Sequence, residues 1–376
     1  MKKTRNLYQY IGFIVFGVAL ILIQVLSGAR IISTSVTRGF GSYMIHVIIV
    51  LGYFLLLGYA GLASLGTAGF VGLGTYITGY LLLHTPLPPL LILLITMLVG
   101  VILGFVVGFI SLRIEGMYLA IITLALSEML SVLFKNAIGF TGGTSGLNTY
   151  GAKPKLFGLI LLDRTNTFYF IAVVVVILLV LTYNLTKSPV GRAMLSMKNS
   201  ESAAQTMGVS SLKYRLFAFI VSSVFAMIAG FLYMLYYRYS EPTKWTINLS
   251  LNVLASVVIG GTGSIWGILI GTYFVFSLND TLLTNFTFFQ QNPNAFIFLT
   301  GTLMILVVMF YPGGISQLIF TIKYKGKILL GKLAKMRAEK KEALASQAAV
   351  AEVALSPSET DQKMKEGDEH DGKSAK

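Results

Sequence analysis

The sequence predicts an all-α, polytopic integral membrane protein with about eight to ten membrane-spanning helices and a helical hairpin in the cytoplasm. Of its 376 residues, 55% are hydrophobic and 12% are charged, whereas charged residues make up about a quarter of a typical soluble domain. Uncharged runs recur at the length of about 20 residues that a helix needs to cross the hydrocarbon core. Lysine and arginine flank these runs, as they do in membrane proteins, so the net charge of +14 does not indicate nucleic-acid binding.

The apolar runs divide the chain into ten predicted membrane segments. The first is longer than the apolar part of a cleavable signal, and we expect it to be retained. Glycine shortens the segments around 58–80 and 248–280, which leaves eight as the alternative count. The ten segments are 10–28, 43–60, 65–83, 89–112, 117–134, 167–186, 215–237, 248–262, 264–280 and 295–312.

The positions of lysine and arginine predict the orientation in the cell membrane. With the basic N-terminus in the cytoplasm, most of the other basic residues also lie inside, in segment 187–215 and in the C-terminal region. This agrees with the excess of positive charge on the inner side of membrane proteins, so both termini are predicted to be cytoplasmic. The basic residues that run against this rule are Arg30, Arg38, Lys135, Lys153, Lys155 and Arg164.

Three regions are predicted from changes in composition. Residues 1–322 form the transmembrane domain. Residues 323–344 combine leucine with many basic residues, which suits a helix lying on an anionic cytoplasmic leaflet, although a solvated charged tail is an equal alternative. Residues 345–376 have no core-forming pattern and are predicted to be disordered.

Small residues recur every four positions in three segments. This spacing places them on one helix face, where they let a neighbouring helix approach closely. We therefore predict helix packing at each of these sets. They are Gly100, Gly104 and Gly108; Ala218, Ser222, Ala226 and Gly230; and Gly263, Gly267 and Gly271.

Segment 58–80, "GYAGLASLGTAGFVGLGTYITGY", has too many glycines for an ordinary span. Irregular backbone within a membrane is tolerated where it lines a cavity or is buried in protein. Two interpretations therefore remain, a translocation pathway and tight helix packing. The residues assigned to the pathway here are Gly66, Thr67, Gly69 and Gly72.

Glu128, in "LALSEML", is an acidic residue placed well within a predicted span. Because a carboxylate in the membrane is costly, we expect it to face the bundle or a wet cavity and to be partnered or protonated. Ser131, three residues on, is expected to share its face. Glu128 is assigned to the pathway, with a packing or hydrogen-bonding role as the alternative.

The polar stretch 187–215 interrupts the apolar chain. Ser188 is a good N-cap and Pro189 suits the first helical position, so a short helix is predicted from 189 to about 198. A second turn, "ESAAQTM", follows and ends at Gly208, a natural left-handed residue. The result is a compact hairpin that could dock on another protein, although a merely solvated loop is the alternative.

The core of this stretch, "ESAAQTMG", resembles the cytoplasmic coupling motif of permeases from ATP-driven (ABC) importers. Several other stretches, spread over about residues 45–320, resemble the LivM-type permeases of branched-chain amino acid importers in the same order. They are "GYAGLASLGTAGFVGLGTY", "RIEGMYLAIITLALSEML", "TGGTSGL", "SPVGRAM" and "VIGGTGSIWGILIG". The chain departs from the family at Thr67, where a histidine is common, and in "NLSLNVLASVVIGG", where Glu-Asn is often found.

The resemblance implies a permease subunit that works by alternating access. It implies four partners besides membrane lipid: two cytoplasmic ABC ATPases, a second LivH-like permease and an extracytoplasmic solute-binding protein that docks on outer loops including 135–166. The chain has no phosphate-binding G-x-x-x-x-G-K-[ST] motif, so the ATPases are separate subunits. The hairpin would carry their motion to helices 167–186 and 215–237. The residues assigned to coupling are Arg192, Glu201, Ala203, Ala204 and Gly208.

Other functions remain as alternatives. A related permease for urea, amides, simple sugars or nucleosides would share the same architecture, and a secondary transporter or channel would lack the coupling hairpin. The sequence shows no paired carboxylates, nucleophile–base set or metal cluster, it has no cysteine, and its three histidines are scattered. We therefore predict neither enzymatic activity nor a metal or other cofactor.

Overall fold

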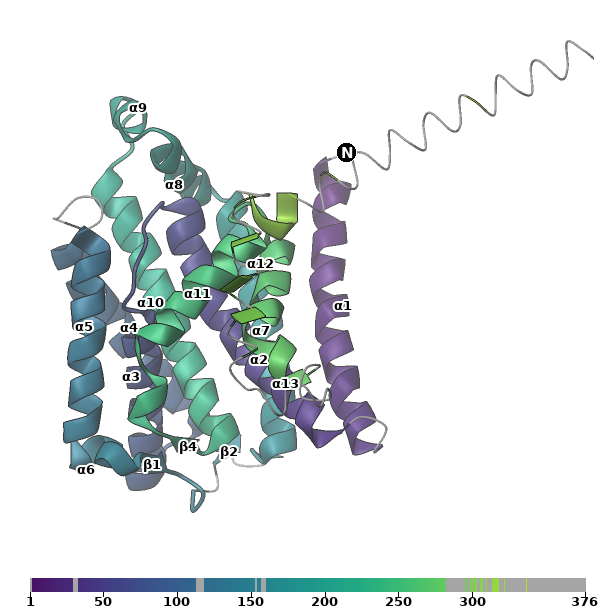
Figure 1. Ribbon diagram of the computed structural model, residues 1–376, viewed down its shortest axis with the longest axis vertical. Helices are drawn as coiled ribbons and strands as arrows, with labels where there is room; N and C mark the ends of the chain where they lie inside the picture. The colour runs from purple at the N-terminus through teal and green to yellow at the C-terminus, as the bar shows by residue number, and fades with distance from the viewer. Residues whose placement is uncertain are drawn as a thin grey trace, which may run out of the picture. The chain divides into compact units, whose positions relative to one another are not determined.

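The computed structural model describes residues 2–29, 33–112, 118–152, 154–156 and 160–281, together with 295, 298–299, 301–302, 305–306, 309, 313–317, 321 and 336. The chain divides into two units, Met1–Leu318 and Ile319–Lys376. All elements labelled in Figure 1 belong to the first unit. The basic helix predicted at 323–344 lies outside the described residues except for position 336, and the tail at 345–376 lies wholly outside them.

The first unit is a bundle of long helices. In chain order the α-helices are α1 (Lys2–Gly28), α2 (Thr34–Tyr53), α3 (Thr67–His84), α4 (Pro89–Ser111), α5 (Tyr118–Asn136), α6 (Ile138–Thr141), α7 (Arg164–Lys187), α8 (Pro189–Asn199), α9 (Glu201–Thr206), α10 (Ser211–Tyr237), α11 (Ile247–Gly260), α12 (Ile265–Thr272) and α13 (Leu278–Thr281). π-Helical turns extend α2 through Phe54–Tyr59 and join α12 to α13 through Tyr273–Ser277. Single 3₁₀ turns lie at Gly143–Ser145 and Pro242–Lys244.

Six helices of the described chain are long and apolar enough to cross a membrane: α1, α2 with its π-helical turn, α4, α5, α7 and α10. The other predicted segments are shorter or less apolar, or lie mostly outside the described residues. Helix α3 has 18 residues, and glycine and threonine lower its hydropathy, while α11 has only 14. Residues 265–277 form a shorter apolar helix. The predicted segment 295–312 lies mostly outside the described residues.

Helix α2 begins nine positions before the predicted start at residue 43. The predicted boundary was wrong here because it left out residues 34–42, which include Arg38. The Ser33 side chain caps the helix instead, accepting a hydrogen bond from the Val36 N–H at 3.4 Å. The charged residue therefore lies in the first turns of a longer helix.

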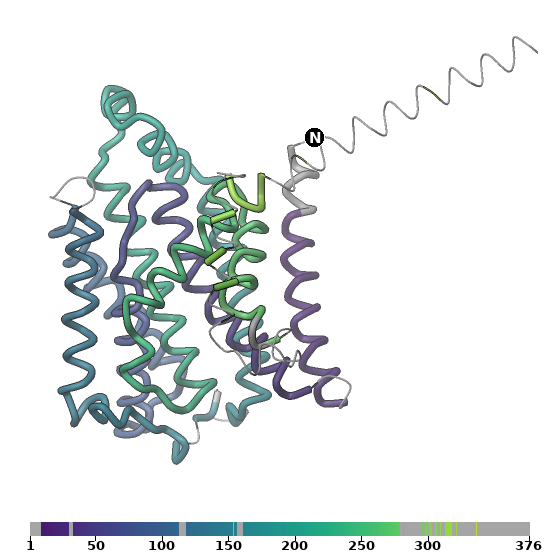
Figure 2. The backbone as a smooth tube through the Cα atoms, in the orientation of Figure 1, coloured from purple at the N-terminus to yellow at the C-terminus, as the bar shows by residue number. Residues whose placement is uncertain are grey.

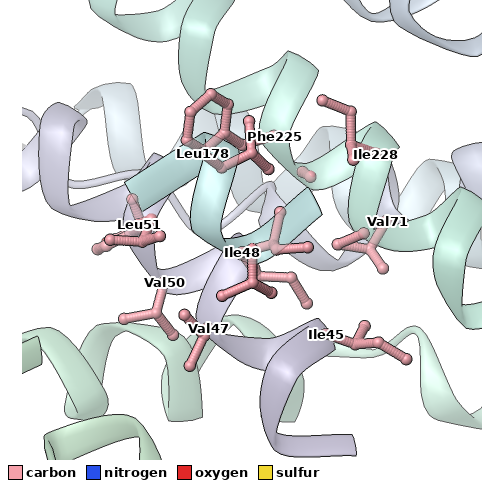
Figure 3. Packing of buried hydrophobic residues seen from close by; sticks show 14 of the residues in the cluster. Ile45, Val47, Ile48, Val50, Leu51, Val71, Leu178, Phe225 and Ile228 are labelled. Carbon is pink, nitrogen blue, oxygen red and sulfur yellow. The ribbon is translucent and has the colours of Figure 1, made fainter. Parts of the chain in front are cut away.

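Helices α2 and α10 form the centre of the bundle, since both are buried along most of their length, whereas α1, α4 and α5 expose most of theirs. Helix α10 packs against α2, α3 and α4. Figure 3 shows Ile45 and Ile48 of α2, Val71 of α3, and Phe225 and Ile228 of α10 in one cluster of buried hydrophobic residues. The core is thus built from segments that are far apart in the sequence.

The predicted small-residue stripes pack helix against helix. A Cβ on Gly100 would lie 3.0 Å from the Met227 side chain of α10, and one on Gly104 would lie 3.0 Å from Ser223. Gly267 and Gly271 approach the backbone of α11. The prediction was wrong only for Gly263, which has nothing within 4 Å of an added Cβ, because it precedes α12 in a turn.

The two ends of the bundle carry different structures. Helices α8 and α9 project at one end, and α6, β1 (Leu147–Asn148) and β4 (Tyr239–Ser240) lie at the other (Figure 1). The backbone trace in Figure 2 follows the same excursion of α8 and α9 beyond the long helices. Strands β1 and β4 pair antiparallel, as do β2 (Lys155–Leu156) and β3 (Ile160–Leu161).

Arg238 holds the loops at the end that carries β1 and β4. It takes a left-handed conformation at the end of α10, with φ 58°. Its guanidinium donates hydrogen bonds to the carbonyl oxygens of Ala152, at 2.7 Å, and Leu162. The long connection after α5 is therefore tied to the end of α10.

Candidate functional site: the coupling hairpin and the break before α3

The hairpin of α8 and α9 is fixed by local capping. The Ser188 side chain accepts a hydrogen bond from the Gly191 N–H at 3.2 Å, with Pro189 at the first position of α8. The Ser200 side chain likewise accepts one from the Ala203 N–H at 3.4 Å and starts α9. These caps confirm the predicted start of the first helix and its interruption before the second.

Gly208 ends α9 in a Schellman motif. The Gly208 N–H donates to the Gln205 carbonyl oxygen at 2.9 Å, and the Val209 N–H donates to that of Ala204 at 3.0 Å. Gly208 has φ +81°, a conformation that favours glycine because it carries no Cβ. The predicted left-handed position is confirmed, and an added Cβ would have nothing within 4 Å. The constraint at Gly208 is therefore conformational rather than one of space.

The hairpin has a buried side and an exposed side. Met194, Met197 and Ala204 are buried against the chain itself, whereas Ala203 is exposed and Met207 is 84% exposed. Of the two alanines assigned to coupling, only Ala203 is therefore available to a partner on this side, because adjacent residues of a helix point in different directions.

Glu201 is engaged within the chain. Its two carboxylate oxygens accept hydrogen bonds from Arg215 of α10 at 2.9 and 2.7 Å. This bidentate geometry is the strongest form of such a pair, although Glu201 is 42% exposed and solvent screens the interaction. Arg215 lies fourteen positions away and was not predicted as the partner of Glu201. Arg192 remains exposed and donates to the Lys187 carbonyl oxygen at 2.9 Å.

The predicted interruption of the span around 58–80 is present. The backbone leaves helical geometry after Tyr59 and resumes it at Thr67. Side chains of other helices satisfy its free N–H groups: Leu65 donates to Thr123 Oγ1 and Ala68 donates to Ser250 Oγ, both at 3.0 Å. The irregular backbone is thus supported from α5 and α11.

The four residues assigned to the pathway at this break are buried. A Cβ on Gly66 would lie 3.1 Å from the Thr123 carbonyl oxygen, and one on Gly69 would lie 2.8 Å from Leu130 of α5. One on Gly72 would lie 2.6 Å from Phe134. Close packing, the alternative left open by the sequence, therefore accounts for the glycines within this chain. Their place in a pathway stays a prediction.

Thr67 lines a small cavity between α3 and α10 that has both polar and apolar walls. The cavity has a volume of about 10 Å³, and its walls include Ser64, Ser222 and Ser223. This volume matches about one water molecule and is too small for an amino acid. Passage of a solute at this position would require the helices to separate.

Glu128 was predicted to face the bundle or a wet cavity and to share a face with Ser131; it lies on the exposed face of α5, so within this chain it neither faces the other helices nor shares the buried side of Ser131. It is exposed, as are Ile121, Met129 and Val132, whereas Ser131 is 2% exposed and faces inward. No hydrogen bond or ion pair of Glu128 occurs within the described parts of the chain. The prediction failed because helical spacing places residues on faces without showing which face the neighbouring helices cover.

Broken helices inside an apolar bundle are typical of membrane transporters, and the capped polar hairpin at one end completes the architecture of a polytopic membrane permease. The family described as "Branched-chain amino acid transport system / permease component" matches residues 35–308, and the chain belongs to this family.

Individual relatives agree with this assignment. The high-affinity branched-chain amino acid transport system permease LivM of Escherichia coli (strain K12) is 30% identical over 295 residues, which cover 72% of this chain and 68% of that protein. A probable LivH permease of Methanocaldococcus jannaschii is 31% identical over 161 residues, 43% of this chain and 47% of that protein. The ribose import permease RbsC of Haemophilus influenzae is 30% identical over 129 residues, 32% and 40% respectively. No solved structure matches the chain significantly.

Proposed function

We propose that the chain is a permease subunit of an ATP-driven importer for branched-chain amino acids that works by alternating access. The observation that carries the proposal is the capped hairpin of α8 and α9, which stands at the end of a bundle of this permease family. The complex would contain two ABC ATPases, and one of them would dock on the exposed side of this hairpin, near Arg192 and Ala203. A solute-binding protein would dock at the opposite end, on the loops between α5 and α7.

A LivH-like permease is the second membrane subunit in this proposal. The exposed face of α5 supports it, because Ile121, Met129 and Val132 surround an ionisable residue near the middle of that helix. A carboxylate facing lipid at this depth is costly, so a protein or a hydrated space is the more favourable neighbour. We assign Glu128 to the boundary between the two permeases, where the pathway would run.

Uptake by the complete transporter tests the substrate. Vesicles that hold this chain with its partner permease, ATPases and binding protein should accumulate radiolabelled leucine when ATP is supplied. Excess valine should inhibit this uptake, and urea and ribose should not. Inhibition by ribose and not by valine would favour a sugar permease, the alternative to which the partial similarity with the ribose permease points. Uptake that needs no ATP would contradict an ABC importer.

Cysteine labelling tests the proposed orientation, in which the hairpin is cytoplasmic. The chain has no cysteine, and Ser200 and Ser145 are both exposed. Ser200 joins α8 to α9 and Ser145 lies between α6 and β1, and Figure 1 shows these elements at opposite ends of the bundle. Ser145→Cys should react with a membrane-impermeant maleimide in intact cells. Ser200→Cys should react only after the cells are permeabilised. The reverse pattern would place the hairpin outside and contradict its docking to ATPases.

A further inference from the structure

Lys198 connects the hairpin to a distant part of the bundle. Its Nζ donates a hydrogen bond to the carbonyl oxygen of Gly58 at 2.8 Å, across 140 positions of sequence. Its aliphatic chain lies beside Gly61, since a Cβ added there would be 3.3 Å from Lys198 Cγ. Burial lowers the pKa of Lys198, as expected for an ammonium group partly withdrawn from water. A specific polar contact therefore attaches α8 to the bundle.

The carbonyl oxygen that accepts this hydrogen bond lies at the end of a helix. Gly58 lies in the last turn of the π-helical extension of α2, two residues before the chain leaves helical geometry. The last carbonyl groups of a helix lack partners within the helix, and a cation placed there interacts favourably with the helix dipole. Gly61 then takes φ +72°. Lys198 thus contacts the point where the regular part of α2 stops and the break begins.

The break continues to the small cavity beside α10. The Ser64 N–H donates to the Tyr53 hydroxyl at 3.3 Å, and Ser64 and Thr67 line the cavity between α3 and α10. A displacement of the end of α2 would therefore reach the contact between α3 and α10 within a few residues. Side-chain contacts of the hairpin include Lys198 with the end of α2, and Glu201 with Arg215 and Gln205 with Ser211, both of α10.

We propose that Lys198 is a positioning residue that transmits displacement of the hairpin to the break between α2 and α3. The inference rests on the importer function proposed above and specifies how ATPase motion reaches the transmembrane helices. A residue that only stabilised the fold would change uptake and ATP hydrolysis together. A residue in the transmission route changes the amount of solute moved per ATP hydrolysed.

Proteoliposomes containing the complete transporter allow this ratio to be measured. Lys198→Met keeps an apolar chain beside Gly61 and removes the ammonium group. It should lower leucine uptake per ATP hydrolysed about tenfold, the effect of losing one charge-assisted hydrogen bond, while ATP hydrolysis continues. Lys198→Arg keeps a cationic donor and should restore most of the ratio. Lys213→Met, at an exposed lysine at the start of α10, is the matched control and should leave it unchanged.

A second measurement detects movement of the break itself, first in a transporter that keeps Lys198. The half-buried Ala63 lies in the break, and Ala63→Cys would be the only cysteine of the chain. Its rate of reaction with a maleimide should change when ATP is added, and this change should disappear when Lys198→Met is combined with it. A labelling rate independent of ATP in a transporter that imports leucine would overturn the inference.

The two proposals fail in different ways. A normal uptake ratio for Lys198→Met, in a transporter whose unsubstituted form shows ATP-dependent uptake, overturns the role of Lys198 and leaves the proposed function in place. If the unsubstituted transporter shows no ATP-dependent uptake of leucine, both the function and the inference are overturned.

Discussion

Gly230→Ala should lower the thermal midpoint of the purified permease complex by about 5 °C or more, and Gly230→Val should prevent its accumulation in the membrane. A Cβ on Gly230 would meet the backbone of α3, with the Thr75 nitrogen at 2.7 Å and the Gly74 carbonyl carbon at 3.1 Å. The backbone of a packed helix cannot rotate away as a side chain can. Overpacking in a core costs about 1–3 kcal/mol, and contact with backbone on this scale lies at the upper end.

Helices α3 and α10 have little freedom to separate at this point. The Thr75 hydroxyl donates a hydrogen bond to the Gly230 carbonyl oxygen at 3.2 Å, and Gly74 approaches the backbone of Met227 from the same side. Gly139→Ala is the matched control, because an added Cβ there has nothing within 4 Å. Equal midpoints for Gly230→Ala and Gly139→Ala in a thermal unfolding assay would contradict the close approach of the two helices.

Gly208→Val should abolish most ATP-dependent uptake while the complex still assembles. A side chain in the left-handed conformation costs about 1–2 kcal/mol, and a β-branched one is the least tolerated. Because an added Cβ meets no neighbour, this strain acts on the hairpin backbone alone. The Schellman motif would open, and the direction in which the chain leaves α9 would change.

Gly208→Asn provides the control for this prediction, since asparagine enters the left-handed region more readily than other residues. Uptake of radiolabelled leucine should fall at least tenfold for Gly208→Val and less than threefold for Gly208→Asn, as expected from the strain of about 1–2 kcal/mol. The amount of complex in the membrane, measured by quantitative blotting, should be similar for both. Normal uptake by Gly208→Val would show that the geometry of the hairpin is not needed for coupling.

The features that the sequence predicted well depend on local signals. Ser188, Pro189 and Gly208 determine helix ends through their own backbone and side-chain chemistry, and the structure places each as expected. The glycines at 100 and 104 were assigned to packing because spacing alone defines a helix face. The interruption around 60–66 was predicted for a similar reason, since glycine-dense backbone is a poor continuous span.

The features that were missed depend on which helices become neighbours. Glu128 and Ser131 are three residues apart, but only the structure shows that other helices cover Ser131 and leave Glu128 exposed. The hairpin packs back on the bundle, and only the structure shows this. It brings Glu201 to Arg215 and Lys198 to the carbonyl oxygen of Gly58. The start of α2 was missed because Arg38 is compatible with the first turns of a helix whose end reaches water.

Helix α10 runs from the hairpin to the loops at the opposite end of the bundle. It contains 27 residues, which corresponds to about 40 Å of α-helix. Near its beginning Arg215 is bonded to the hairpin, and just beyond its end Arg238 is bonded to the loops that carry β1. One continuous rod therefore joins the two water-facing sides of the molecule. In the importer proposed above, capture of a loaded binding protein on one side and the nucleotide state of the motor on the other would both act on this helix, even before any solute enters the membrane.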